Sequence, residues 1–266
     1  MMGGRYMRGF AAGIAALFAL TFAQPSEAQR AESRAGEFDY YALVLNWSPS
    51  YCATQGRSRQ GEPQCSGDRP YSFILHGLWP QYNRGWPQDC PTQERPWVPE
   101  ELIREMLDIM PSKRLIIHQY RKHGTCSGLT PSEFFRVSRQ LFDQIKIPPR
   151  FQNPESHLTL SPADVESEFL SVNPQLRPDM ISIACKGRNL GDLRICFGRD
   201  LRLQSCGVNE TQEKLCSSEK IVMPPVRLGR GDSGGGNGGY RDDPNEARGG
   251  GREEQNETED QGEDRD

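Results

Sequence analysis

Four polar side chains between residues 118 and 123 combine the types and the spacing that proton transfer at an anion requires. In their order around an α-helix they are His118, Lys122, Gln119 and His123. At about 100° per residue they span roughly 140°, so their polar heads share one face. An imidazole takes or gives a proton near neutral pH because its unperturbed pKa is about 6.5. The segment therefore predicts a helix face that holds an anion and moves a proton.

A further histidine, His76, comes from another element. It follows the apolar run 73–75 and opens the five residues His-Gly-Leu-Trp-Pro, so the pattern predicts a strand over 71–76 that delivers the histidine. Gly124 is expected to end the helix, since glycine takes the left-handed conformation at a helix end without strain. Cys126 can then tie that end down through a disulfide. A strand and a helix end must therefore meet for His76 to join the other four side chains.

The two segments resemble the signature blocks of the ribonuclease T2 family, which are secreted endoribonucleases of the transferase type. The first block is His-Gly-Leu-Trp-Pro at 76–80, the second keeps Lys-His-Gly-Thr-Cys at 122–126, and the likeness spans residues 40–216. One position departs from the pattern, because Gln119 stands where the family usually has glutamate. The resemblance implies an enzyme that cleaves single-stranded RNA, leaves DNA intact and uses neither a metal nor another cofactor.

The resemblance also implies a role for each polar residue. The 2′-hydroxyl of RNA is the nucleophile, so cleavage needs a base, an acid and donors for the charge on phosphorus. His123 is the expected base and His76 the expected acid for the departing 5′-oxygen. Lys122 and His118 are expected to hold the phosphate, and the amide of Gln119 to donate to a phosphate oxygen. The products would be 2′,3′-cyclic phosphates, which are then hydrolysed to 3′-phosphates.

Aromatic residues near the first block are candidates for base stacking. Trp79 belongs to the block, and Tyr82 and Trp86 follow it in a segment rich in proline, asparagine and glycine. A base stacked on an aromatic side chain contributes about 1 to 3 kcal/mol. A place in the core is the alternative for Trp79. The sequence predicts Trp79 and Tyr82 as substrate-binding residues and leaves the base preference open.

Two other classes of function remain as alternatives. A metal hydrolase would use His118 and His123, but their spacing is five, the two-histidine zinc helix motif requires four with a glutamate, and no third ligand is apparent. A catalytically inactive binding protein would share the fold, but the expected proton-transfer histidines and Lys122 are all present. An endoribonuclease therefore remains the preferred interpretation.

The eight cysteines indicate disulfides, since the sequence contains no Cys-x-x-Cys pair of the kind that zinc sites use. An exported chain folds in an oxidising compartment, where disulfides persist. The sequence alone does not choose among the many possible pairings. The resemblance implies Cys90 with Cys126, Cys185 with Cys216 and Cys196 with Cys206, which leaves Cys52 with Cys65.

Residues 1–28 are predicted to be a signal peptide. Arg5 and Arg8 precede an apolar run over 10–23, and Ser26-Glu-Ala28 matches the small-x-small pattern that signal peptidase cleaves. A transmembrane anchor is the alternative, but about 14 apolar residues are too few to cross a bilayer core. The mature chain is expected to begin near Gln29, to be secreted or periplasmic, and to have no membrane contact after cleavage.

Residues 227–266 are predicted to be a disordered, glycine-rich acidic tail, with six arginines against twelve acidic residues and almost no apolar side chains. An acidic tail that competes with RNA for the cleft is the alternative. Residues 29–226 then form one ribonuclease domain, expected to be a monomer. This domain is close to neutral, so its contact with nucleic acid is expected to be local to a cleft.

Periodicity and helix starts predict the fold class. Alternating apolar residues indicate a strand over 39–47, and further strands are expected at 71–76, 180–185, 193–197 and 201–203, the last two as a hairpin. Helices are expected to begin at Pro99 and after the capping boxes at Thr130 and Ser161. Strands and helices do not alternate strictly, which favours an α+β domain with a mainly antiparallel sheet, braced by the disulfides.

Overall fold

The computed structural model describes residues 1, 33–54, 62–66, 69–93 and 95–227. Of the expected signal peptide (1–28) and the expected tail (227–266), residues 2–28 and 228–266 lie outside the described residues. Within the described part of the chain, no helix has both the length and the apolar character needed to cross a membrane.

The described residues form one mixed sheet of six strands. The strands are β1 (Tyr40–Trp47), β2 (Phe73–Gln81), β3 (Leu158–Leu160), β4 (Ile181–Lys186), β5 (Asn189–Gly198) and β6 (Ile221–Met223). Their order is β2-β1-β5-β6-β3, and β4 also pairs with β5. Four of the pairings are antiparallel, while β5 and β6 meet in parallel at a single residue pair. The α+β class with a mainly antiparallel sheet is therefore confirmed.

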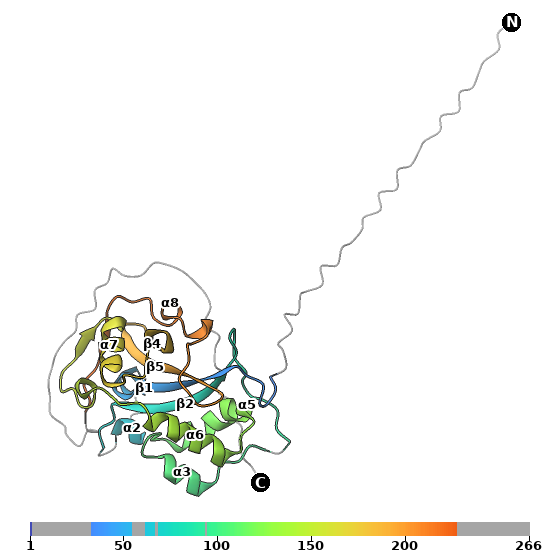
Figure 1. Cartoon of the computed structure of the whole chain (residues 1–266), viewed down its shortest axis with the longest axis horizontal. Helices are drawn as coiled ribbons and strands as arrows, with labels where there is room; N and C mark the ends of the chain where they lie inside the picture. Colours follow the sequence, from blue (N-terminus) through green and yellow to red (C-terminus); the bar gives the residue numbers. More distant parts are fainter. Residues whose placement is uncertain (2–32, 55–61, 67–68, 94, 228–266) are drawn as a thin grey trace. The chain divides into compact units, whose positions relative to one another are not determined.

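Helices contact several strands of this sheet. They are α1 (Ser48–Thr54), α2 (Pro63–Ser66), α3 (Glu100–Met106), α4 (Lys113–Gln119), the π-helix η2 (Tyr120–Gly124), α5 (Thr125–Ser127), α6 (Pro131–Asp143), α7 (Pro162–Val172) and α8 (Gln212–Leu215), with short 3-10 turns η3 (Pro149–Phe151), η4 (Pro178–Met180) and η5 (Val208–Glu210). Figure 1 shows α3, α5 and α6 gathered on one side of β1 and β2. Both expected capping boxes are present, with Thr130 and Ser161 as the N-caps of α6 and α7. α6 contacts β1 and β2, whereas α7 and α8 contact β4.

One face of the three central strands packs in the hydrophobic core, and the opposite face carries the polar residues Asn46, Asp192 and Arg194 beside the buried Tyr40, Ala42 and Val44. Successive side chains of a strand point to opposite faces. The core side chains of the three central strands are Tyr41, Leu43, Leu45 and Trp47 of β1, Phe73, Leu75 and Leu78 of β2, and Leu193, Ile195 and Phe197 of β5. The alternate positions 40, 42, 44 and 46 of β1 therefore face the other way, together with positions 192 and 194, which pair with 46 and 44.

A β-bulge in β2 lies at His76. Leu45 of β1 pairs with Leu75 and the preceding Val44 pairs with Gly77, so His76 is the extra residue. A bulge reverses the alternation of side chains beyond it. This is why Leu75 and Leu78, three residues apart, both pack in the core. The expectation that the strand ends at His76 is wrong, because pairing with β1 continues past the bulge to Gln81.

Gly124 does not end the helix that carries His118 and His123, contrary to the expectation from the sequence. Its backbone is right-handed, with φ −61° and ψ −38°, and the helical segment continues to a cap at Gly128 with φ 75°. Thr125 donates its N–H to the carbonyl of Tyr120, five residues back, which makes this turn π-helical. A Cβ on Gly124 would lie 2.4 Å from Cδ2 of Tyr120. Glycine is required here for close packing and not for a left-handed conformation.

Of the remaining expectations about local structure, the disulfides are confirmed and the hairpin is wrong. The four disulfides are confirmed, and none of the described cysteines is free. The hairpin expected between 193–197 and 201–203 is wrong in its second strand, because Leu203 forms an isolated bridge with Phe197. Instead β4 and β5 pair as neighbours in the chain. The chain turns between β4 and β5 at Gly187, which adopts φ 57°.

Candidate active site

The two histidines expected to transfer protons both contact Trp79. The His123 ring stacks on the indole with centroids 4.9 Å apart and planes at 21°. The His76 ring meets the indole edge-on, at 5.2 Å and 73°. Trp79 lies on the same face as His76 because of the bulge between them. The strand block and the helix block of the sequence are therefore joined through one indole.

Gln119 is also held by this indole. Trp79 donates its Nε1–H to Oε1 of Gln119 at 2.7 Å. An indole N–H is a donor with no acceptor capacity, so it requires the oxygen of the amide and leaves the amide nitrogen for another acceptor. Gln119 is buried, and a Cβ at Gly77 would lie 2.0 Å from its Oε1. A glycine in β2 is therefore what makes room for the amide.

His123 has an environment that disfavours its protonated form. The residue is 6% exposed, and its Nδ1 is buried without a hydrogen-bond partner among the described residues. Burial, followed by the charges of Lys122, His76, His118 and Arg194, lowers the pKa of His123 to about 3. The ring is consequently neutral at neutral pH and able to accept a proton.

His76 has a carboxylate partner. Its Nδ1 lies 3.4 Å from Oδ1 of Asp192, and the same oxygen accepts a hydrogen bond from Nδ2 of Asn46 at 3.0 Å. Burial acts to raise the pKa of Asp192, but the hydrogen bond and charge of His76, with Asn46 and Arg194, outweigh it and hold that pKa below its ordinary value. Asp192 is therefore ionised. No motif in the sequence predicted a role for Asp192, and its only local signal is a charge directly before the apolar strand expected over 193–197.

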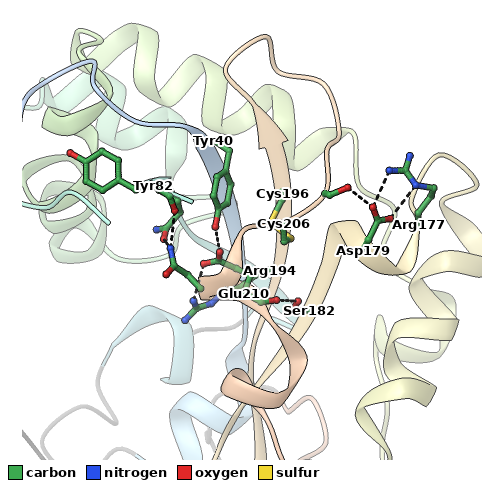
Figure 2. Close-up of a disulfide and its surroundings, with 12 residues drawn as sticks. Tyr40, Tyr82, Arg177, Asp179, Ser182, Arg194, Cys196, Cys206 and Glu210 are labelled. Carbon is green, nitrogen blue, oxygen red and sulfur yellow. Dashed lines mark hydrogen bonds and ion pairs between the residues drawn. A yellow bond between two sulfur atoms is a disulfide. The ribbon is translucent and has the colours of Figure 1, made fainter. Parts of the chain in front are cut away.

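Arg194 approaches Trp79 from β5. Its guanidinium carbon lies 5.1 Å from the centroid of the indole, a cation–π contact. Its Nη1 lies 3.4 Å from Oε1 of Glu210, a buried carboxylate that also accepts a hydrogen bond from the hydroxyl of Tyr40. Figure 2 shows Tyr40 and Arg194 converging on Glu210, with Ser182 donating to the Glu210 backbone. Burial raises the pKa of Glu210. This network was also missed, because it joins residues distant in the sequence.

The other expected site residues are His118, Lys122 and Tyr82. His118 is exposed and Lys122 half-buried, and both lower the pKa of His123, so they lie within electrostatic range of it. Tyr82 packs half-buried against the core, and its carbonyl accepts from Nδ2 of Asn209 at 3.0 Å. Within the described residues, the contacts that join the histidines to Trp79 do not extend to Tyr82.

The loop over 82–98 is bonded to the helical segment that carries Lys122 and His123. Asp89 donates its N–H to the carbonyl of Lys122 at 2.8 Å, and Cys90 is bonded to Cys126. Arg121 adds a longer hydrogen bond to the carbonyl of Pro96, at 3.5 Å. The part of the chain that the structure describes holds no group of three or more histidine, cysteine, aspartate or glutamate side chains arranged for a metal ion.

Comparison with known proteins identifies a family. The family model described as the Ribonuclease T2 family matches residues 38–206. The chain is 44% identical over 125 residues to a ribonuclease of Aeromonas hydrophila, a match that covers 47% of this chain and 54% of the relative. It is 28% identical over 180 residues to a probable ribonuclease of Haemophilus influenzae, covering 63% of this chain and 61% of the relative. The chain thus spans between half and two thirds of the length of these relatives.

Solved structures share the fold. An RNase-related protein from Calystegia sepium superimposes with a TM-score of 0.56 at 21% sequence identity. The superposition covers 71% of this chain and 98% of that protein. The described residues therefore share the fold of that protein.

Proposed function

The chain belongs to the ribonuclease T2 family, and from that premise we propose that it is an endoribonuclease that cleaves single-stranded RNA without a metal. One observation carries the proposal, which is the placement of His76 and His123 against one indole in contrasting environments. His123 is buried and neutral, whereas His76 faces an ionised carboxylate. A base and an acid need such different surroundings to work at one pH.

In the proposed reaction, His123 takes the proton of the 2′-hydroxyl, and the 2′-oxygen attacks the adjacent phosphorus. His76 gives a proton to the 5′-oxygen as its bond to phosphorus breaks, which leaves a 2′,3′-cyclic phosphate. Water then opens the cyclic phosphate to a 3′-phosphate, with the two histidines in exchanged roles. DNA lacks the 2′-hydroxyl and is not cleaved.

The phosphate is bound by cations and an amide in this proposal. Lys122 and His118 supply positive charge beside His123. The amide nitrogen of Gln119 donates to a phosphate oxygen, which its orientation favours because Trp79 occupies the amide oxygen. Such donors stabilise the charge that develops on the phosphorus oxygens.

The two aromatic residues have different parts in the proposal. Trp79 is engaged by His123, His76 and Gln119, so its main role is to hold these side chains in position. Tyr82, at the end of β2, is proposed to contact a base. The protein is further proposed to act as a monomer after export, with residues 29–226 as the catalytic domain.

The test is an incubation of the mature protein with single-stranded RNA and with DNA of the same sequence, each with and without EDTA. We expect RNA cleavage in both conditions, 2′,3′-cyclic phosphate ends at early times, and intact DNA. His76→Ala and His123→Ala should each abolish cleavage while the protein stays folded. Loss of activity in EDTA would favour a metal hydrolase. RNA binding without cleavage would favour an inactive binding protein.

A further inference from the structure

We propose that Asp192, held by Asn46, is the positioning residue for His76, and that it keeps the proton of the neutral imidazole on Nδ1 so that Nε2 is the nitrogen presented to the substrate. The inference rests on the proposed ribonuclease function and adds residues outside the two sequence blocks. Asp192 does not touch the reacting atoms and acts through His76.

Strand register brings the three side chains together. β1 lies between β2 and β5 in the sheet. Asn46 of β1 pairs with Asp192 of β5, and it pairs with Ile74 of β2 two residues before His76. The bulge in β2 leaves His76 and Trp79, three residues apart, on this face. The polar side chain of β1 can therefore support a contact that crosses from β2 to β5.

The hydrogen bonds hold the carboxylate in one orientation. Asn46 donates from Nδ2 to Oδ1 of Asp192 at 3.0 Å and to the carbonyl of Gly191 at 3.2 Å. The amide is thus bound to both the side chain of Asp192 and the backbone beside it. Oδ1 faces Nδ1 of His76 at 3.4 Å. Free enzymes often have catalytic hydrogen bonds of this length, which shorten when substrate binds.

Protonation chemistry follows from that contact. An ionised carboxylate is an acceptor with no proton to donate, so the nitrogen that faces it must carry the hydrogen. In His76 that nitrogen is Nδ1, which leaves Nε2 as the acceptor of the neutral ring and as a second donor of the imidazolium. The acid step that we propose for His76 requires this second donor to face the departing oxygen.

The charges around the pair allow Asp192 to stay ionised. His76 and Arg194 are the charged side chains that act on Asp192, and Asn46 donates to it. On the helix side, His123 interacts electrostatically with His76 and with Arg194. The side chains of His76 and Asp192 are 32% and 20% exposed, so the pair is partly accessible to solvent.

The decisive measurement is the tautomer of His76 in the wild-type protein, from the ¹⁵N chemical shifts of its ring nitrogens at a pH where the ring is neutral. We expect the proton on Nδ1. In Asp192→Ala the Nδ1 preference should be lost, whereas Asp192→Asn, which keeps an acceptor oxygen, should retain part of it. A wild-type ring protonated on Nε2 would overturn the proposal. This measurement needs no activity, so it is independent of whether the protein cleaves RNA.

Kinetics supply the second test. Partners that orient a functional histidine typically contribute about 10- to 100-fold, so we expect Asp192→Ala to lower kcat by that factor with KM within about twofold. The alkaline limb of the pH profile of Asp192→Ala should move to lower pH, because the negative charge beside His76 is gone. Asp192→Glu should restore part of kcat. Asp143→Ala removes an exposed carboxylate at the end of α6 and is the control. It should change neither kcat nor the alkaline limb of the pH profile. Equal kcat in wild type and Asp192→Ala would contradict a positioning role.

Discussion

Trp79 donates its indole N–H to the amide oxygen of Gln119, at 2.7 Å. The bond determines which end of the amide is left for a substrate, because the indole accepts nothing in return. It also places Gln119 beside His123, since both side chains contact the same indole. The replacement of the family's usual glutamate by glutamine therefore keeps the contact with Trp79 and changes the group next to it from a carboxylate oxygen to an N–H donor.

Gln119→Glu should move the alkaline limb of the pH profile to higher pH. A glutamate can still accept from Trp79, but its second oxygen adds negative charge near the histidines, and that charge favours their protonated forms. The measurement is the pH dependence of kcat/KM for both proteins on one dinucleotide. We expect the wild type to be active, with its alkaline limb below that of the variant. Coincident limbs would refute the electrostatic argument, and a gain of about a hundredfold would mean that charge at this site is essential.

Gly77→Ala should lower kcat/KM by about tenfold or more, because a misplacement of about 1 Å at a catalytic group costs that much or more. The new methyl group would lie 2.0 Å from Oε1 of Gln119 and 2.7 Å from Nε1 of Trp79, so one of them must move. Steady-state kinetics with Gly77→Ala, Gln119→Ala and the double variant would test this. We expect the alanine at 77 to cost less when Gln119 is already truncated. Strictly additive effects would show that Gln119 is not what the methyl group displaces.

His123 should make the folded protein less stable at acid pH. Its pKa of about 3 lies below the ordinary value of 6.5, so below about pH 6.5 the unfolded chain binds a proton that the folded protein does not. The stability present above pH 6.5 is then lost as the pH falls toward 3, about 5 kcal/mol in all. Urea unfolding of wild type and His123→Gln from pH 7 to pH 3.5 checks this. The variant should lose less stability over the range, and parallel curves would contradict the prediction.

The disulfide between Cys90 and Cys126 should matter more for activity than the one between Cys52 and Cys65. Loss of a native disulfide typically costs about 2 to 5 kcal/mol. The first bridge joins the 82–98 loop to the helical segment that carries Lys122 and His123, whereas the second closes a loop between α1 and α2. Paired alanine variants of each bridge, assayed well below their melting temperatures, should differ, with activity falling mainly in the Cys90/Cys126 pair. Equal losses would mean that the effect is one of general stability.

The sequence by itself determined the local features of this protein. The alternation from Tyr41 to Trp47, the capping boxes at Thr130 and Ser161 and the two signature blocks all depend on residues close together in the chain. Such patterns reflect backbone conformation and short-range hydrogen bonds, which neighbouring residues largely decide. The family resemblance added the four disulfide pairings and the histidines that the fold brings together.

Only the tertiary structure decided how the site is supported. His76 meets Asp192, 116 residues further along the chain, through the register of three strands and a bulge that no local pattern announced. Gly124 lies inside the helical segment with the ring of Tyr120 packed against it, although glycine is the usual residue at a helix end. The contact of His76 with Asp192 and the packing at Gly124 both depend on side chains that come together when the strands and helices assemble. His76 and Asp192 are distant in sequence, and at Gly124 a Cβ would also lie 3.2 Å from Cδ1 of Phe134, so packing and not local preference settles both positions.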